Sequence, residues 1–131
     1  MILLDTHAWI WWVSNPEELS EAARSRIDDA AEHSDVLVSC ISTWEVMLLV
    51  AKSRLELSMD AKGWIAESER IPFVRFVPVD NQVAVKSVSL PMPFHSDPAD
   101  RIIVATAMIA DAAVVTKDQK LLNYAHVETI W

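Results

Sequence analysis

Four acidic residues lie where a strand should end or a helix should begin, each in a segment otherwise too apolar to need a charge: Asp5, Glu45, Asp100 and Asp118. Carboxylate oxygens are the hard ligands that Mg²⁺ and Mn²⁺ prefer. A bound ion of this kind lowers the pKa of a water ligand and offsets charge on a phosphoryl group. The four acids therefore suggest a metal site, and the predicted reaction is hydrolysis of a phosphate ester.

Asp5 and Asp118 each follow a short apolar run, at residues 2–4 and 113–116. Both runs have the character of buried strands whose carboxyl ends carry an acid. In open α/β sheets, ligands bind just outside those ends. Asp5 follows three aliphatic residues and precedes an aromatic-rich segment, so we expect its carboxylate to be partly buried and to have a partner.

Each of the other acids also has a purely structural explanation. Glu45 lies three residues after Ser42, which matches a capping box in which Glu45 bonds back to the Ser42 amide. Asp97, Pro98 and Asp100 match the N-cap, N1 and N3 positions of a helix. Asp118 is equally suited to a turn or to the cap of a short helix. Taken singly, these acids are as well explained by capping as by metal binding.

Convergence of all four acids favours the metal site. Two carboxylates about 5 Å apart repel each other by roughly 3 kcal/mol at an effective dielectric constant of 20. Only protonation or a cation relieves that cost. We therefore expect a divalent ion wherever these side chains meet.

Strand patterns alternate with helical patterns along the whole chain. Strands are predicted at residues 2–4, 36–40, 74–79 and 113–116, with a final one at 127–130. Helices are predicted at residues 7–13, 16–31, 42–52, from about 58, 80–88, 101–109 and from 119, and a proline-rich loop at 90–98. Strands separated by helices require crossover connections, so the expected fold is α/β, with a parallel sheet between layers of helices.

Length and composition predict one domain over residues 1–131. The single cysteine excludes a disulfide framework, and no apolar stretch approaches the roughly 20 residues that span a bilayer, so we expect a cytoplasmic protein. The net charge of -8 argues against a broad basic surface for nucleic acid, but a bound cation would reverse the local sign. The single glycine excludes a glycine-rich phosphate-binding loop.

Four segments, in order and spanning nearly the whole chain, resemble the motifs of PIN domains, in particular VapC-type ribonuclease toxins. They are LLDTH at residues 3–7, STWE at 42–45, DPADRIIVATA at 97–107 and VTKD at 115–118. The resemblance implies a three-layer sandwich with a mainly parallel sheet of four to five strands. It also implies a toxin endoribonuclease that cleaves RNA with Mg²⁺ or Mn²⁺, forms a homodimer and is bound by a VapB-like antitoxin.

By the same resemblance, Asp5, Glu45, Asp100 and Asp118 are the metal-binding acids. Thr6 and Thr116 are polar neighbours that orient ligands or water. Asp97 is assigned mainly to capping and is kept as a secondary metal candidate.

Two other functions stay open. A phosphatase of the haloacid dehalogenase type also begins with an Asp after an apolar strand, but expects a second Asp where this chain has His7. An inactive PIN-like scaffold would bind partners only through its aromatic surface. Six tryptophans favour such a surface, because Trp9, Trp11 and Trp12 cannot share one helix face; we expect some of them at a protein interface, with base stacking as the alternative.

Overall fold

The computed structural model describes residues 1–131 and contains one parallel sheet of five strands in the order β3-β2-β1-β4-β5. The strands are β1 (Ile2–Leu4), β2 (Val36–Ser39), β3 (Val74–Val77), β4 (Ala113–Val115) and β5 (Thr129–Ile130). The helices are α1 (Thr6–Ser14), η1 (Pro16–Glu18), α2 (Glu21–Glu32), α3 (Cys40–Ala51), α4 (Ala61–Glu69), α5 (Asn81–Val88), α6 (Pro98–Ala110) and α7 (Gln119–Leu122). The predicted α/β architecture and its parallel sheet are confirmed.

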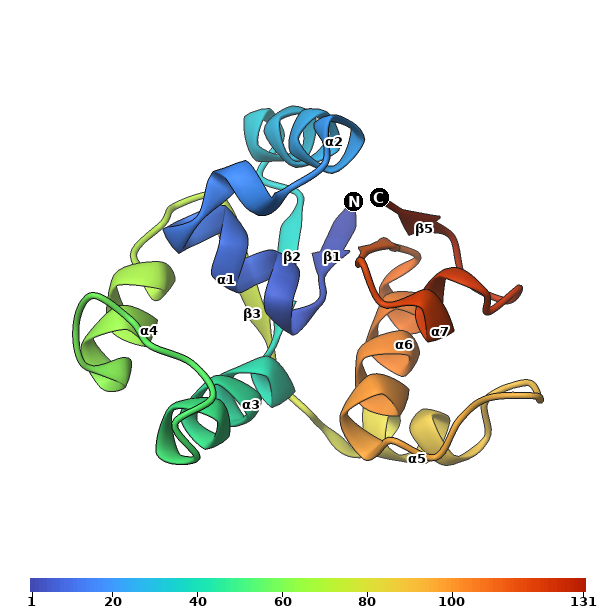
Figure 1. The fold of residues 1–131 in the computed structure, drawn as a ribbon. Coiled ribbons are helices and arrows are strands. Elements are labelled where there is room, and N and C mark those ends of the chain that lie inside the picture. The colour runs from blue at the N-terminus through green and yellow to red at the C-terminus, as the bar shows by residue number, and fades with distance from the viewer.

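Side chains that alternate along the strands contribute to a buried core on each face of the sheet. Ile2, Leu4 and Val36 belong to one buried cluster, which also holds residues of α1, α2 and α4. Leu3 and Leu37 point to the opposite face and pack with residues of α6. Because successive side chains of a strand point to opposite faces, a fully apolar strand supplies both layers. Figure 1 shows α1, α2 and α4 on one side of the sheet and α5 and α6 on the other.

Two predicted boundaries are wrong, and side-chain caps explain both. The segment predicted as a helix over residues 16–31 is interrupted: Pro16 begins a short 3-10 turn, and α2 starts only after Ser20, whose side chain accepts a hydrogen bond from the Ala23 amide. The helix that carries Glu45 starts at Cys40, because the Ser39 side chain accepts from the Ile41 amide. Ser42 therefore lies inside α3, and the predicted capping box does not form.

The tryptophans of α1 are not the exposed ones. Trp9 is fully buried and packs against Trp64 and Phe76, while Trp11 and Trp12 are half-buried. The indole of Trp64 also donates a hydrogen bond to the Ser14 hydroxyl at 2.8 Å. Only Trp9 is taken up completely by the core, and Trp11 and Trp12 keep part of their surface exposed, so a protein interface at these rings stays a prediction.

The strand order decides where a ligand can approach. From β1 the chain proceeds to β2 and β3 on one side, whereas β4 and β5 lie on the other side. The carboxyl ends of β1 and β4 therefore flank the point at which the order reverses, which is where ligands bind in open α/β sheets. Asp5 and Thr116 directly follow these two strands. None of the helices is both long and apolar enough to pass through a membrane.

Candidate metal centre

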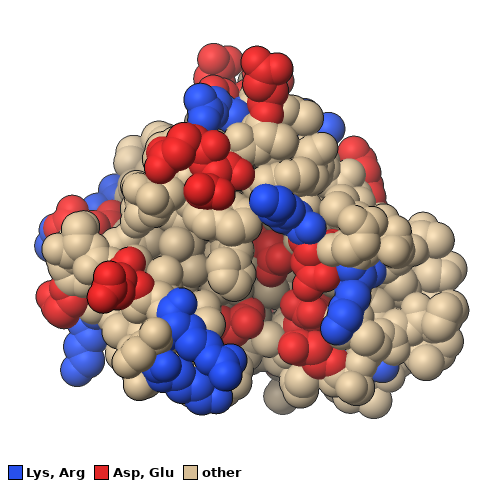
Figure 2. Space-filling view, in the orientation of Figure 1, with Lys and Arg blue, Asp and Glu red and all other residues tan.

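The predicted acids meet in one pocket of about 470 Å³ at this edge of the sheet. Its lining contains Asp5, Thr6, His7, Trp11, Glu45, Asp97, Asp100, Lys117 and Asp118. All four acids and the secondary candidate Asp97 are thus brought together from segments up to 113 residues apart in the sequence, between Asp5 and Asp118. Figure 2 shows acidic side chains gathered in a central hollow, with basic side chains around its edge.

Asp5 occupies the base of the site and serves the fold as well. Its Oδ1 accepts a hydrogen bond from the Thr6 amide at 2.8 Å and caps α1, while Oδ2 accepts from the Thr116 hydroxyl at 2.7 Å. Thr116 also accepts from the Asp118 amide at 3.0 Å. The first and last acids are therefore linked through one buried threonine, whose side chain sets the orientation of the Asp5 carboxylate.

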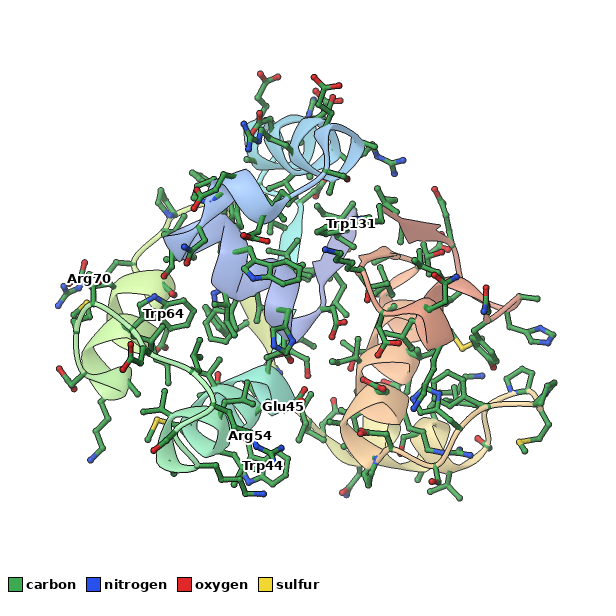
Figure 3. All side chains as sticks on the ribbon, viewed as in Figure 1. Trp44, Glu45, Arg54, Trp64, Arg70 and Trp131 are labelled. Atoms are coloured by element: carbon green, nitrogen blue, oxygen red, sulfur yellow. The ribbon has the colours of Figure 1, made fainter.

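Glu45 is held by the second buried threonine. Thr6 Oγ1 donates to Glu45 Oε1 at 2.7 Å and lies 2.9 Å from the Ser42 hydroxyl. Both Thr6 and Ser42 are almost completely buried. Figure 3 shows Glu45 on α3, and Glu45 lines the acid pocket. The prediction that Glu45 bonds to the Ser42 amide is replaced by a side-chain contact across two elements.

Asp100 has a partner that was absent from the predicted site. His95 Nε2 donates to Asp100 Oδ2 at 2.6 Å, and the His95 ring stacks on Phe94 with centroids 4.5 Å apart. Arg101 Nε donates to the His95 carbonyl oxygen at 3.0 Å, and Arg101 NH1 donates to the Ser87 carbonyl oxygen at 3.1 Å. His95 lies in the proline-rich loop at residues 90–98, and its contact with Asp100 could not be predicted because it depends on the conformation of that loop.

The other two acids act as helix caps. Asp97 Oδ1 accepts from the Asp100 amide at 3.1 Å, which places Asp97 at the N-cap of α6 as predicted. Asp118 Oδ1 accepts from the Lys120 amide at 2.8 Å and caps α7. Both still line the pocket, so capping and contribution to the negative potential of the site occur together.

Burial and mutual repulsion make the ionised form of the cluster costly. Burial raises the pKa of Asp5, although hydrogen bonds from Thr116 and Thr6 oppose the shift. Burial also raises the pKa of Glu45 to about 7, and the charges of Asp5 and Asp100 add to the increase. The pKa of Asp100 rises to about 6, chiefly through burial, although the His95 hydrogen bond opposes it. A cation in the pocket would relieve these shifts.

The side chains fit a hydrated ion better than a tightly caged one. No three His, Cys, Asp or Glu side chains are placed so that they could hold a metal ion together. Mg²⁺ usually keeps several waters and binds through one or two carboxylates plus substrate phosphates. An open pocket with oxygen donors and raised carboxyl pKa values matches that mode of binding, and Mn²⁺ accepts the same ligands.

A family model described as the PIN domain matches residues 2–127. The chain belongs to the PIN domain family. Over 133 aligned residues, this PIN domain is 38% identical to Ribonuclease VapC22 of Mycobacterium tuberculosis, covering 99% of this chain and 98% of that protein. The resemblance predicted from the four motifs is confirmed, and the haloacid dehalogenase alternative is wrong.

Two solved structures have the same fold as this PIN domain. FitAcB from Neisseria gonorrhoeae has 29% identity and a TM-score of 0.68, and the match covers 98% of this chain and 96% of that chain. VapBC2 from Rickettsia felis, bound to a promoter DNA fragment, has 14% identity and a TM-score of 0.66, with 98% and 97% covered. At the lower identity the likeness concerns the fold alone.

Proposed function

We propose that this PIN domain, residues 1–131, is a divalent-metal-dependent endoribonuclease and the toxin of a toxin and antitoxin pair. The observation that carries the proposal is the convergence of Asp5, Glu45 and Asp100, with raised pKa values, at the switch point of the sheet. The similarity to Ribonuclease VapC22 supports RNA as the substrate.

In this proposal, the acids bind the metal ion and the threonines position the acids. Asp5, Glu45, Asp100 and Asp118 would hold Mg²⁺ or Mn²⁺, with Asp97 as a secondary candidate. When bound, the ion supplies an activated water and offsets charge on the phosphodiester. Thr6 and Thr116 fix the carboxylates of Glu45 and Asp5 through short hydrogen bonds.

His95 is a positioning residue for Asp100. Its imidazole holds one carboxylate oxygen, Oδ2, of a residue that lines the pocket. An ionised carboxylate only accepts hydrogen bonds, so Nε2 carries the proton in this contact. Lys117 lies over the Trp11 ring, 5.7 Å from its centroid, and is the one Lys or Arg of the pocket lining, where it could contact an RNA phosphate.

We further propose a VapB-like antitoxin as partner, because related structures are VapBC complexes and a pocket of acids suits a basic segment. The net charge of -8 adds long-range attraction for such a partner.

A homodimer is also part of the proposal. Val85 and Val88 on α5 are 70% and 81% exposed, and lie on one side of the helix at i and i+3. Exposed apolar pairs of this kind mark protein contacts. We expect Val88→Asp to lower the mass measured by light scattering from dimer to monomer, while Val79→Asp, outside α5, should leave it unchanged. A dimer that survives Val88→Asp would place the contact elsewhere.

Cleavage of a structured RNA pool in Mg²⁺, Mn²⁺ or EDTA tests the nuclease. Asp5→Asn and Asp100→Asn should each abolish metal-dependent cutting, whereas Asp60→Asn, at the cap of α4 outside the pocket, should leave it intact. Silence of the wild-type protein, freed of any antitoxin, would instead favour the inactive scaffold.

A further inference from the structure

Trp44 is the tryptophan that packs in none of the core clusters. Trp9, Trp11, Trp12, Trp64 and Trp131 each pack against another aromatic ring. Trp44 is 55% exposed, belongs to no buried cluster and stacks on no other ring. Its large planar face lies on the surface next to Glu45, where it is free to stack against a ligand.

A slot of about 230 Å³ lies beside this ring, between α3 and the start of α6. Its walls include Trp44, Leu48, Leu49 and Pro98. The slot shares Glu45 with the acid pocket, and Asp97 also lines both. A ligand whose phosphate reaches the acids therefore has its neighbouring group at the mouth of the slot.

We propose that the slot binds a base of the RNA, stacked on Trp44, one nucleotide from the phosphate at the acid pocket. This proposal rests on the proposed ribonuclease function, and it places one contact between the RNA substrate and the protein at Trp44. Trp44 thereby holds RNA by a contact that every base can make, because each base has a π-face.

The size and charge of this region favour a base over a protein segment. The slot is smaller than the ~300–1,000 Å³ of pockets for drug-sized ligands, and so suits a single planar ring. Figure 3 places Arg54 in the same region as Trp44, and Figure 2 shows a group of basic side chains on this side of the acid hollow. Arg54 is exposed, and cations here match the phosphates that flank a bound base.

Three variants separate stacking from general apolar contact. Trp44→Phe keeps an aromatic face, and Trp44→Leu keeps an apolar side chain but removes the ring. Met47→Ala is the matched control, because Met47 is an exposed residue of the same helix, 37% accessible, that does not line the slot. Trp44 and Met47 are exposed and belong to no buried cluster, so all three proteins should melt within a few degrees of the wild type.

The binding probe is a fluorescein-labelled oligouridine of about five nucleotides, measured by anisotropy with Ca²⁺, which takes oxygen ligands. Trp44→Leu should bind about 5- to 150-fold more weakly than the wild type, which is the usual worth of one stacked base. Trp44→Phe and Met47→Ala should bind within about threefold of the wild type. A strand of the same length without bases should bind wild type and Trp44→Leu equally, which isolates the contact between base and ring.

Equal oligouridine affinity for wild type and Trp44→Leu would overturn the inference and leave the slot to a protein partner. Absence of wild-type binding would overturn it as well. Parallel cleavage assays keep the two proposals apart: a nuclease lost in Asp5→Asn but unaffected in Trp44→Leu stands without the slot. Binding lost in Trp44→Leu, from a wild type that never cuts RNA, would keep the slot and reject the nuclease.

Discussion

Asp5 combines a structural and a functional role in a single side chain. Its two oxygens accept hydrogen bonds from the Thr6 amide and the Thr116 hydroxyl, yet burial raises its pKa. The hydrogen bonds offset part of the desolvation, and the remainder destabilises the ionised form. This residual cost is what a bound cation would relieve.

Replacing Asp5 by Asn should therefore stabilise the metal-free protein while abolishing cleavage. The neutral amide can still accept from Thr6, and the Thr116 hydroxyl can rotate to accept from the amide. We expect the melting temperature in EDTA to rise by a few degrees at pH 8, corresponding to about 1 kcal/mol. The gain should vanish at acid pH, where the wild-type carboxyl is also protonated. An unchanged melting temperature at pH 8 would argue against a strained carboxylate.

His95 is the second residue with a decisive contact, because it holds Asp100 at 2.6 Å. Loss of a partner that orients a metal ligand typically weakens metal binding 10- to 100-fold. His95→Ala should show a loss of this size for Mn²⁺ in isothermal titration calorimetry. His95→Gln, which can present an amide donor near the Nε2 position, should recover most of the affinity.

His126→Ala is the control for His95, since His126 is exposed and lies outside the acid pocket. Equal Mn²⁺ affinities for His95→Ala and wild type would show that Asp100 needs no such support.

At the scale of elements, the start of α6 carries both a cap and a site residue. Asp97 accepts from the Asp100 amide, and the same turn presents Asp100 to the pocket. The helix dipole and the cap both favour negative charge at this end. A substitution of Asp97 that keeps the cap should preserve the stability of the fold, whereas a loss of cleavage in such a variant would report on metal binding. The two roles of Asp97 can therefore be measured separately.

Asp97→Ala should lower the free energy of unfolding by about 1 kcal/mol, the usual value of an N-cap, while Asp97→Ser should retain most of it. If Asp97 acts mainly as a cap, Asp97→Ser should keep nearly full cleavage, in contrast to Asp100→Asn. Denaturant unfolding and RNA cleavage measure the two effects. Cleavage lost in Asp97→Ser despite wild-type stability would make Asp97 a main metal ligand.

At the scale of the whole molecule, the acid cluster couples stability to pH and to metal. The folded-state pKa values of Glu45 and Asp100, about 7 and about 6, lie above their ordinary values of 4.5 and 3.8. The folded protein thus holds protons that the unfolded chain releases. This contribution to stability is fully present below about pH 4 and is lost as pH rises through 6 and 7.

The melting temperature of the metal-free protein should therefore fall by several degrees between pH 5 and pH 8, and Glu45→Gln should flatten the fall. Mg²⁺ at ten times its dissociation constant should add about 1.4 kcal/mol at pH 8, because it binds only the folded state. Calorimetric scans with and without Mg²⁺ measure both effects. A stability curve that is identical for wild type and Glu45→Gln would contradict the pKa assignment.

The sequence by itself determined the features that depend on near neighbours. Apolar runs specified both faces of the strands, and Asp60, Asp80 and Asp97 cap helices through amides three residues away. The motifs also identified the family and named the five acids that line the pocket, with Asp97 as the secondary candidate. Alternation and local caps involve near neighbours, so spacing limits where they can occur, although the Ser42–Glu45 box did not form and the cap at Ser20 was missed.

Only the tertiary structure decided which side chains touch. Thr6 meets Glu45 across 39 residues and Thr116 meets Asp5 across 111, because the strand order places β1 between β2 and β4. Trp44 is the exposed tryptophan because the other five belong to one core cluster or pack against it. Contacts between distant segments depend on how the helices pack on the sheet, and sequence spacing holds no record of that packing.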